Sequence, residues 1–397
     1  MVTNIYYREG SAVVSAEFTE KSLTDITISG PDRDLRPGDV YVGRISKTVP
    51  SIHAAFVDIG ADRDCFLKLS NVTAPIATPS HKDGELHAGD AIIVQIERED
   101  GRNKPATVVT EFSLTGVNLV LIHGKKGVRC SAKIPDGERR SDLRRLAGEW
   151  IDGSYTLMVR THAYETSDEE IYREFTVLRE RYFDIAEKGL YKSKGNVLVR
   201  GLPAYLCELR DNRKQIPDRV LIQGGDIAEE LRAFSASFAP SYTDKIEVLG
   251  ENEYPLSAQF DMKKHLSELS SRKLWLKSGA FLVIEPTEAM TVIDVNTGKS
   301  SVSNACEKSF LPCNIEAARE IARQLRLRNI SGIIIIDFIN MNNPVDRETL
   351  LTELKAMTSS DPTETKVVDM TPLGLVEITR MKRRRPLSED LRKYLDF

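Results

Sequence analysis

The sequence predicts an α+β protein built from several domains. Its 397 residues are enough for about two to four domains of ordinary size. Short strands with Gly-Asp turns dominate residues 36–120, whereas a strand–helix–strand pattern occupies the C-terminal third. A hydrophobic share of 41% and a charged share of 29% are typical of a globular chain, and they exclude one that is disordered throughout.

Two features of the sequence indicate the cellular compartment of the protein. No apolar run approaches the roughly 20 residues of a membrane span, and the N-terminal segment lacks the pattern of a signal peptide. The five cysteines are scattered without a C-x-x-C pair, which indicates reduced thiols and argues against a disulfide framework or a cysteine zinc site. We therefore expect a cytoplasmic protein with no membrane partner.

The N-terminal part reads as β structure. Residues 1–35 alternate apolar and polar side chains, which predicts a short β-meander. From Arg36, the segments RPGDVYVGRI and HAGDAIIVQI each place Gly-Asp before a β-branched run. They predict a small antiparallel barrel over about residues 35–120, with Phe56 and Phe66 in two of its strands.

The middle of the chain carries concentrated charge and one clear helix. Residues 121–145 hold eight Lys and Arg against three Asp and Glu, although the whole chain has a net charge of −4. The segment DEEIYREFTVLRERYFDIAEKG predicts an amphipathic helix that ends at Gly189. The acidic total therefore excludes only a protein that coats nucleic acid over its whole surface.

The C-terminal third has the sharpest pattern. FLVIEPTEAMTVIDVNTG predicts two strands around a Pro-Thr turn. CNIEAAREIARQLRLRN predicts a helix with Asn314 as its N-cap, and GIIIIDFINM predicts a strand that is buried on both faces. A charged residue at the end of such a strand is an arrangement that builds sites.

Two carboxylates in these strands are the main candidates for chemistry. The strand period of two puts Asp294 and Asn296 on one face, and Asp337 directly follows an isoleucine run. A lone carboxylate is costly to bury, so we predict that the two strand ends meet and share Mg²⁺, with Asn296 orienting Asp294. The alternative is that Asp294 caps or turns a strand and that Asp337 pairs with an arginine of the intervening helix.

Basic residues nearby are candidates for contact with phosphate. The intervening helix carries Arg319, Arg323 and Arg326 on one side at helical spacing. Beside a metal–carboxylate site such a stripe can form a phosphate clamp, and the alternative is a solvated face. Lys299 follows the DVN strand within one short turn and is a further candidate.

These segments together resemble a known family. IEPTEAMTVIDVNTG, NIEAAREIARQLRLRNISGIIIIDFINM and LGLVEITRMKRRR are similar to the ribonuclease E/G family of bacterial endoribonucleases. GDVYVGRI and AAFVDIGADRDCFLKL resemble its S1-type OB-fold domain, and VRTHAYE resembles its 5′-sensor. The resemblance runs in order over nearly the whole chain and is weakest over residues 211–277.

The resemblance implies a domain map. An RNase-H-like domain contains an inserted S1-type OB-fold barrel and a 5′-sensor, and a DNase-I-like α/β catalytic domain follows it. On this map residues 1–35 and 211–278 form the RNase-H-like domain. Residues 36–120 form the S1 barrel, residues 121–210 the 5′-sensor and residues 279–397 the catalytic domain.

The resemblance also implies roles for single residues. Asp294 and Asp337 would bind Mg²⁺ and Asn296 would orient Asp294, in agreement with the strand pattern. The aromatic residues that hold RNA correspond to Phe56 and Phe66, with Lys104 as the matching cation. For both phenylalanines the alternative is a place in the barrel core.

A pocket for a 5′-monophosphate is implied as well. It corresponds to Gly116, Val120, Arg160 and Thr161, and an arginine beside a hydroxyl suits a phosphate. The family usually offers a basic residue where this chain has Glu364, and the nearest cation is Lys366. Preference for 5′-monophosphorylated RNA is therefore either absent or dependent on Lys366.

We therefore predict a Mg²⁺-dependent endoribonuclease acting on single-stranded RNA. It would leave 5′-phosphate and 3′-hydroxyl ends, in rRNA processing or mRNA decay. One alternative is a non-catalytic S1-type RNA-binding protein, and another is a Mg²⁺ phosphoesterase acting on DNA or a small molecule. The family continues with a zinc link and a small domain, whereas this sequence ends at Phe397, so no zinc-linked tetramer is expected.

Overall fold

The computed structural model describes residues 1–31, 35–78, 85–99, 104–211, 216–238, 240–250, 252–298, 310–359 and 361–395. Helices and strands are mixed along the chain, which confirms the predicted α+β class. The chain divides into two compact units, each made of segments that are distant in sequence. Residues 1–31, 216–230 and 245–397 form the first unit, and residues 32–215 and 231–244 form the second.

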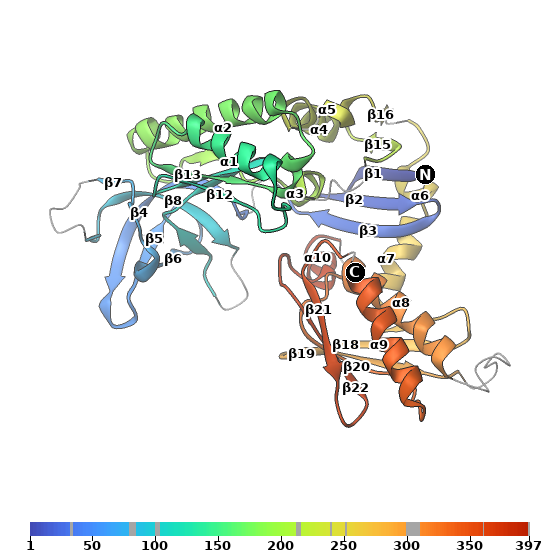
Figure 1. Ribbon diagram of the computed structural model, residues 1–397. Coiled ribbons are helices and arrows are strands. Elements are labelled where there is room, and N and C mark those ends of the chain that lie inside the picture. The colour runs from blue at the N-terminus through green and yellow to red at the C-terminus, as the bar shows by residue number, and fades with distance from the viewer. Residues whose placement is uncertain are drawn as a thin grey trace. The chain divides into compact units, whose positions relative to one another are not determined.

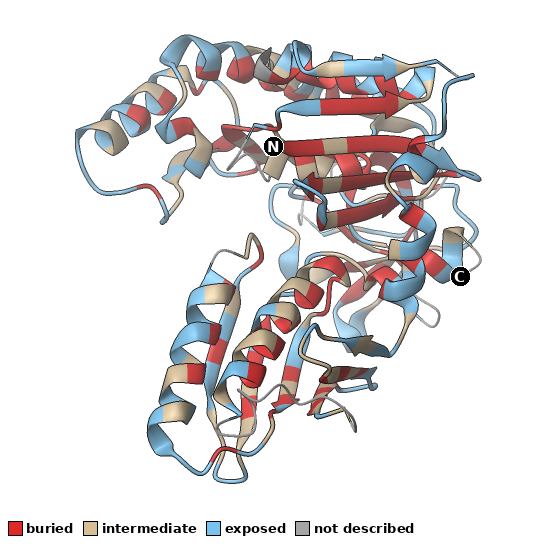
Figure 2. Ribbon diagram, turned by 90° about the vertical axis from the view of Figure 1, so that its right-hand side faces the viewer, coloured by how far each residue is buried: buried red, intermediate tan, exposed pale blue. Residues whose placement is uncertain are grey.

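The first unit begins with a five-stranded sheet in the order β16-β15-β1-β2-β3 (Figure 1). Its strands are β1 (Val2–Glu9), β2 (Ala12–Thr19), β3 (Ser22–Ser29), β15 (Arg219–Gln223) and β16 (Ile246–Leu249). The predicted meander is the antiparallel run β1–β3, whose first two strands are buried along most of their length (Figure 2). The helices that pack against this sheet include α6 (Leu256–Gln259), α7 (Met262–Ser270) and α10 (Leu387–Tyr394).

The second sheet of this unit has the strand order β17-β18-β19-β20-β22-β21. Its strands are β17 (Lys273–Trp275), β18 (Phe281–Pro286), β19 (Met290–Asn296), β20 (Gly332–Asp337), β21 (Thr365–Met370) and β22 (Leu375–Arg380). Two helices accompany them, α8 (Leu311–Leu327) and α9 (Pro344–Ser359). β19 and β20 are parallel and are joined through α8, as the strand–helix–strand pattern predicts.

Helices α8 and α9 lie side by side and pack on one face of this sheet (Figure 1). Ile334 and Ile336 of β20 point to that face and are fully buried. Ile333 points to the opposite face and is 49% exposed. The prediction that this strand is buried on both faces is therefore wrong, because the helices cover only one of them.

Helix α8 also begins earlier than predicted. Its N-cap position is Phe310, so the prediction that Asn314 caps the helix is wrong. Asn314 is completely buried instead: its Nδ2 donates to the Ile339 carbonyl at 2.8 Å, and its Oδ1 accepts from the Ile339 N–H at 3.1 Å. Since Ile339 comes two residues after Asp337, Asn314 fixes the chain just beyond the end of β20.

The second unit contains a closed five-stranded barrel. Strands β4, β5, β6, β9 and β8 pair in that order, and β8 pairs back with β4. The bounds are β4 (Val40–Val49), β5 (Ala54–Asp58), β6 (Cys65–Lys68), β8 (Ala91–Arg98) and β9 (Thr107–Val109), with β7 (Ala77–Thr78) and β14 (Val197–Val199) added at its edges. The predicted barrel is confirmed, although β6 and β9 are parallel rather than antiparallel.

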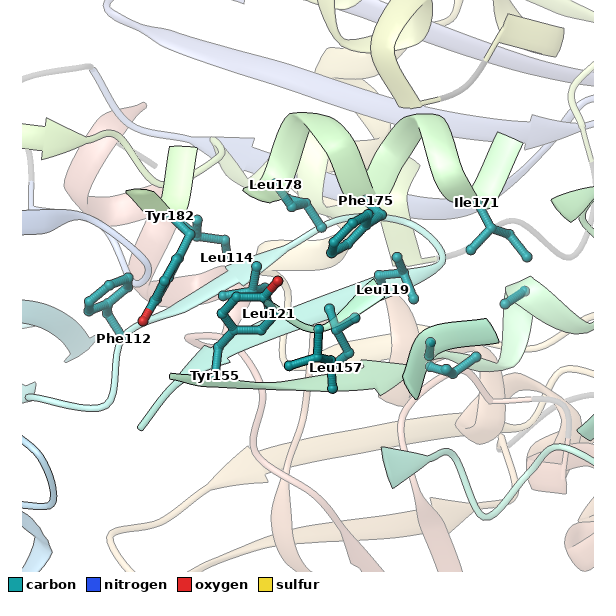
Figure 3. Packing of buried hydrophobic residues seen from close by; sticks show 14 of the residues in the cluster. Phe112, Leu114, Leu119, Leu121, Tyr155, Leu157, Ile171, Phe175, Leu178 and Tyr182 are labelled. Atoms are coloured by element: carbon teal, nitrogen blue, oxygen red, sulfur yellow. The ribbon is translucent and has the colours of Figure 1, made fainter. Parts of the chain in front are cut away.

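A four-stranded sheet in the order β10-β11-β13-β12 follows the barrel. Its strands are β10 (Ser113–Thr115), β11 (Leu119–His123), β12 (Gly127–Cys130) and β13 (Tyr155–Val159). Helix α2 (Asp168–Lys188) packs on it with a stripe of apolar side chains at helical spacing, among them Phe175 and Leu178, which lie against Leu119 and Leu157 (Figure 3). As predicted, α2 ends at Gly189.

Four further helices are described. They are α1 (Glu138–Trp150), α3 (Ala204–Asp211), α4 (Gly225–Phe238) and α5 (Pro240–Thr243). Among the helices that the structure describes, none combines the length and apolar composition needed to cross a membrane.

Candidate functional site

Two carboxylates occupy paired positions on adjacent parallel strands. Asp294 of β19 and Asp337 of β20 are register partners at the ends of these strands. Neighbouring strands lie about 4.8 Å apart and paired side chains point to one face, so the two carboxylates are neighbours. Ile293 and Ile336, one position earlier, point the other way and are buried under the helices. The carboxylates therefore lie on the face that α8 and α9 leave open.

Asn296 holds Asp294 on this face. Its Nδ2 donates to Oδ2 of Asp294 at 2.6 Å. In the described part of the chain neither Asp294 nor Asp337 forms an ion pair, and no arginine of α8 bonds to Asp337. The alternative in which a helix arginine neutralises Asp337 is therefore not what the structure shows.

The donor atoms at this position are oxygens only. The described residues contain no cluster of three or more His, Cys, Asp and Glu side chains that could hold a metal. A pair of carboxylates suits Mg²⁺, which keeps several waters, and it does not suit metals that need imidazole or thiolate ligands. Asp294 and Asp337 are thus the residues that could hold such an ion.

Two of the arginines of α8 bond to backbone carbonyls of another strand. Arg323 Nε donates to the Leu23 carbonyl at 3.1 Å, and Arg326 Nη2 donates to the Thr24 carbonyl at 2.8 Å. Both guanidinium groups therefore contact the start of β3, and α8 lies on the face away from the carboxylates. Arg323 and Arg326 are therefore not part of the site formed by Asp294 and Asp337. Arg319 is exposed on the same helix, and Lys299 lies outside the described residues.

The two phenylalanines of the barrel form a row with a lysine that the sequence did not single out. Lys47, Phe56 and Phe66 are register partners across β4, β5 and β6. The phenylalanine rings meet edge to face with centroids 6.0 Å apart, and Lys47 Nζ lies 4.7 Å from the Phe56 centroid. Hairpin register would have revealed Lys47, because it faces Phe56 directly.

These rings are outside the barrel core. The core holds their sequence neighbours, Ala55 and Val57 in β5 and Cys65 and Leu67 in β6, whereas Phe56 and Phe66 are only partly buried. The alternative in which the phenylalanines fill the barrel is thereby excluded.

Lys104, the predicted cation, is exposed in the segment before β9. The Phe66 N–H donates to the carbonyl of Ala106, two residues further on, at 2.7 Å. This bond brings the segment that contains Lys104 next to β6.

The residues of the predicted 5′-phosphate pocket come from neighbouring elements. Gly116 lies in the turn between β10 and β11, Val120 lies in β11, and Arg160 and Thr161 follow β13. Arg160 Nη1 donates to the Gly116 carbonyl at 2.6 Å, and the hydroxyl of Thr161 lies 3.0 Å from that of Ser131. The structure thus brings Gly116 and Arg160 into contact.

Arg160 already has an anionic partner. Its Nη2 donates to Oδ1 of Asp211 at 2.6 Å, and Arg210 bonds both oxygens of the same carboxylate at 2.9 Å. Burial alone would raise the pKa of Asp211, but the bonds from Arg210 and Arg160 lower it to about 2. At neutral pH a negative charge therefore already lies against Arg160.

A buried glutamate shapes the turn beside Arg160. Glu174 of α2 accepts hydrogen bonds from the backbone N–H groups of Asn118 and Leu119 at 2.9 Å. Burial raises the pKa of Glu174 in spite of these bonds. A side-chain carbon at Gly116 would lie 2.0 Å from Glu174 Oε1, so only glycine fits there. Glu364 and Lys366 are exposed residues of the first unit, at and just before β21.

Comparison with known proteins shows the family to which the chain belongs. Residues 34–107, which contain most of the barrel, match the S1 RNA binding domain. Residues 113–383, which contain Asp294, Asn296, Asp337 and Arg160, match the Ribonuclease E/G family. The chain belongs to the ribonuclease E/G family.

Relatives in this family cover almost the whole chain. This chain is 33% identical over 379 residues to ribonuclease G of Escherichia coli (strain K12). The aligned region covers 93% of this chain and 77% of that protein. Ribonuclease G of Salmonella typhimurium (strain SL1344) is 32% identical with the same coverage. Ribonuclease E of Escherichia coli (strain K12) is 30% identical over 92% of this chain and 35% of that protein.

Proposed function

We propose that this member of the ribonuclease E/G family is a Mg²⁺-dependent endoribonuclease. It cleaves within single-stranded RNA in the cytoplasm, leaves 5′-phosphate and 3′-hydroxyl ends, and serves rRNA processing or mRNA decay. The observation that carries the proposal is the register pairing of Asp294 with Asp337 beside Asn296, in a chain similar to proteins named ribonuclease G and ribonuclease E.

Three side chains at the ends of β19 and β20 have distinct roles in this proposal. Asp294 and Asp337 hold the ion, which when bound supplies a Lewis acid for phosphodiester hydrolysis. Asn296 occupies Oδ2 of Asp294 and leaves Oδ1 available as a ligand. The open sheet face around the pair allows a phosphodiester to lie beside both carboxylates.

The barrel supplies the preference for single strands. Phe56 and Phe66 are partly exposed, and unpaired bases can stack on such rings, whereas bases within a duplex are already stacked on one another. Lys47 and Lys104 add positive charge for the backbone phosphates.

We extend the proposal to the fold of the first unit. The sheet β16-β15-β1-β2-β3 is the RNase-H-like part, which is supported by its three antiparallel strands and by the parallel pairs β1–β15 and β15–β16. The sheet that contains β19 and β20 is the DNase-I-like part.

Cleavage of an internally labelled single-stranded RNA tests the proposal. We expect Mg²⁺-dependent cleavage by the wild-type chain and loss of at least about a thousandfold in Asp294→Asn and in Asp337→Asn, because each removes a charged ligand. Glu285→Gln is the matched control, since Glu285 is an exposed acid of β18 with its carboxylate near Arg272. End-group analysis of the products identifies the phosphate-bearing end.

The rival functions give different results in the same assay. A non-catalytic RNA-binding protein would give four proteins, the wild type and the three variants, that all bind the RNA and do not cleave it. A phosphoesterase for DNA would cut a DNA oligomer of the same sequence at a comparable rate. Either result contradicts the proposal.

A further inference from the structure

Two aromatic rings lie on the same open face as the carboxylates. Trp275 of β17 and Phe281 of β18 are register partners, and their ring centroids are 5.1 Å apart. Their sequence neighbours Leu274 and Leu282 belong to the apolar side of the sheet, under the helices. Trp275 is 62% exposed, which is unusual for so large an apolar side chain.

A lysine accompanies the rings. Lys273 Nζ lies 4.2 Å from the Trp275 centroid and 3.7 Å from the Phe281 centroid. Lys273 is itself exposed, so its ammonium group is held at the rings and still faces solvent. The three side chains together form what we call the aromatic platform: Lys273, Trp275 and Phe281.

The aromatic platform is continuous with the carboxylate site. Phe281 is the register partner of Asn296, which bonds Asp294. A side-chain carbon at Gly298, two residues after Asn296, would lie only 3.3 Å from Trp275 Cζ3, so the chain leaving β19 passes against the indole. By strand spacing, Trp275 lies about 12 Å from Asp294 on one face.

We propose that the aromatic platform binds an unpaired base of the RNA close to the cleaved bond. The inference rests on the proposed function, because it needs Asp294 and Asp337 to be the site of cleavage. Trp275 and Phe281 supply a surface for stacking, which accepts any base. Lys273 supplies a cation for the adjoining phosphate, so base and backbone are both matched.

Charge and continuity favour nucleic acid as the occupant. The carboxylates on this face repel a polyanion, so RNA needs a favourable contact nearby to bring its backbone to them. A cation next to exposed rings is the combination that binds single-stranded nucleic acid. The aromatic platform provides that contact on the strand beside Asn296.

Intrinsic fluorescence tests the proposal without altering the platform. The chain has two tryptophans, and Trp150 packs against Tyr172 and Phe175, so Trp150→Phe leaves Trp275 as the sole tryptophan, which can be excited selectively over tyrosine. In the full chain carrying Trp150→Phe and Asp294→Asn, titration with a short single-stranded RNA should quench the emission. Emission that is unchanged at saturating RNA would overturn the proposal.

Steady-state kinetics of RNA cleavage test whether Trp275 contacts the substrate. Trp275→Ala should raise KM by about 5- to 150-fold with kcat little changed, and Trp275→Phe should restore most of the loss. Tyr254→Ala is the control, because Tyr254 is 66% exposed in the same unit and is not part of this sheet. RNAs with one abasic nucleotide, moved along the sequence, should show a single sensitive position near the cut in wild type and none in Trp275→Ala.

The two proposals fail in different ways. If Asp294→Asn still cleaves, the proposed function is wrong whatever the platform does. If Asp294→Asn is inactive while Trp275→Ala and Tyr254→Ala both keep the wild-type KM, the function stands and the aromatic platform does not bind substrate.

Discussion

Asn296 Nδ2 lies 2.6 Å from Asp294 Oδ2, two positions along the same strand and on the same face. The bond fixes the rotation of the Asp294 side chain, because one of its two oxygens already has a donor. Asn314 acts in a similar way at the other strand, since it anchors Ile339 just beyond Asp337. An amide thus bonds the Asp294 carboxylate directly, and another fixes the backbone just beyond Asp337.

The first prediction concerns the bond from Asn296. Asn296→Ala frees the Asp294 carboxylate to rotate, and we expect affinity for Mg²⁺ to fall by about 10- to 100-fold, as is usual when the group that orients a metal ligand is lost. Titration of cleavage rate against Mg²⁺ and calorimetry with the ion alone measure it. Thr379→Ala, at an exposed position of β22, should behave as wild type. An unchanged metal affinity in Asn296→Ala would show that the bond has no orienting role.

The second prediction concerns the barrel. Phe56→Ala and Phe66→Ala should each weaken binding of single-stranded RNA by about 1–3 kcal/mol, because each removes a stacking surface. Neither ring is in the barrel core, so thermal unfolding should change little. Ile52→Ala is the control, since Ile52 is 56% exposed beside the same strands. Fluorescence anisotropy of a labelled RNA gives the comparison, and equal affinity in all four proteins would contradict the assignment.

The third prediction concerns the 5′ end. Because Asp211 already occupies Arg160 Nη2, the wild-type chain should cleave 5′-hydroxyl and 5′-phosphate RNAs at similar rates. Asp211→Asn removes the negative charge and should favour the 5′-phosphate RNA by about tenfold, the equivalent of one charge-assisted hydrogen bond. Paired cleavage assays on RNAs that differ only at the 5′ end measure the ratio.

Two further variants control this experiment. Arg160→Gln combined with Asp211→Asn should return the ratio to about one. Asp184→Asn removes an exposed carboxylate that pairs with Lys188 elsewhere in the second unit, and it should leave the ratio unchanged. A strong preference for 5′-phosphate in the wild-type chain would refute the role given to Asp211.

The fourth prediction concerns pH and His123. The ring is buried, stacks on Phe112 at 4.9 Å, and its nitrogens lie near the Tyr182 hydroxyl and the Ala74 carbonyl. Burial lowers the pKa of His123, and the opposing effects of Ala74 and Glu111 do not outweigh it. Below about pH 6.5 the unfolded chain therefore takes up a proton that the folded chain does not.

The free energy of unfolding should consequently fall as the pH is lowered below about 6.5, by at most about 1.4 kcal/mol per pH unit from this group. Urea denaturation at pH 7.5, 6.5 and 5.5 measures it, with values chosen at about one-unit steps around the unfolded pKa. His123→Phe should flatten the dependence, whereas His53→Asn, at an exposed histidine, should not. A steeper fall of the unfolding free energy with decreasing pH in His123→Phe would contradict the role given to His123.

Local patterns were enough to predict much of the fold. The alternation in MTVIDVN and the helical spacing between Ile315 and Leu325 describe β19 and α8 closely, because one face of each element is buried in a single core. The predicted start of α8 is too late, because the helix begins at Leu311 with Pro312 in its first turn, and Asn314 bonds to Ile339 instead of capping the helix. Such long-range bonds leave no periodic signal.

The site was predictable only in part for the same reason. Asp294 and Asp337 stand out because each carboxylate follows a β-branched run, where its charge is costly to bury. The partner of Arg160 does not, since Asp211 lies in a segment without a motif and meets Arg160 only through the fold. Likewise the buried ion pair of Arg380 with Asp361, with an N–O distance of 2.8 Å, joins two positions that no spacing rule connects.

The open face of the β17–β22 sheet has a consequence for the form of RNA that can be cut. Helices α8 and α9 shield one side, and Ile333 and Trp275 remain exposed on the other. A reactive centre on an uncovered surface receives a polymer from the side, whereas a centre inside a tunnel receives it by threading from a terminus. If the proposed function holds, we therefore expect a covalently closed RNA circle to be cut as readily as a linear strand of the same sequence.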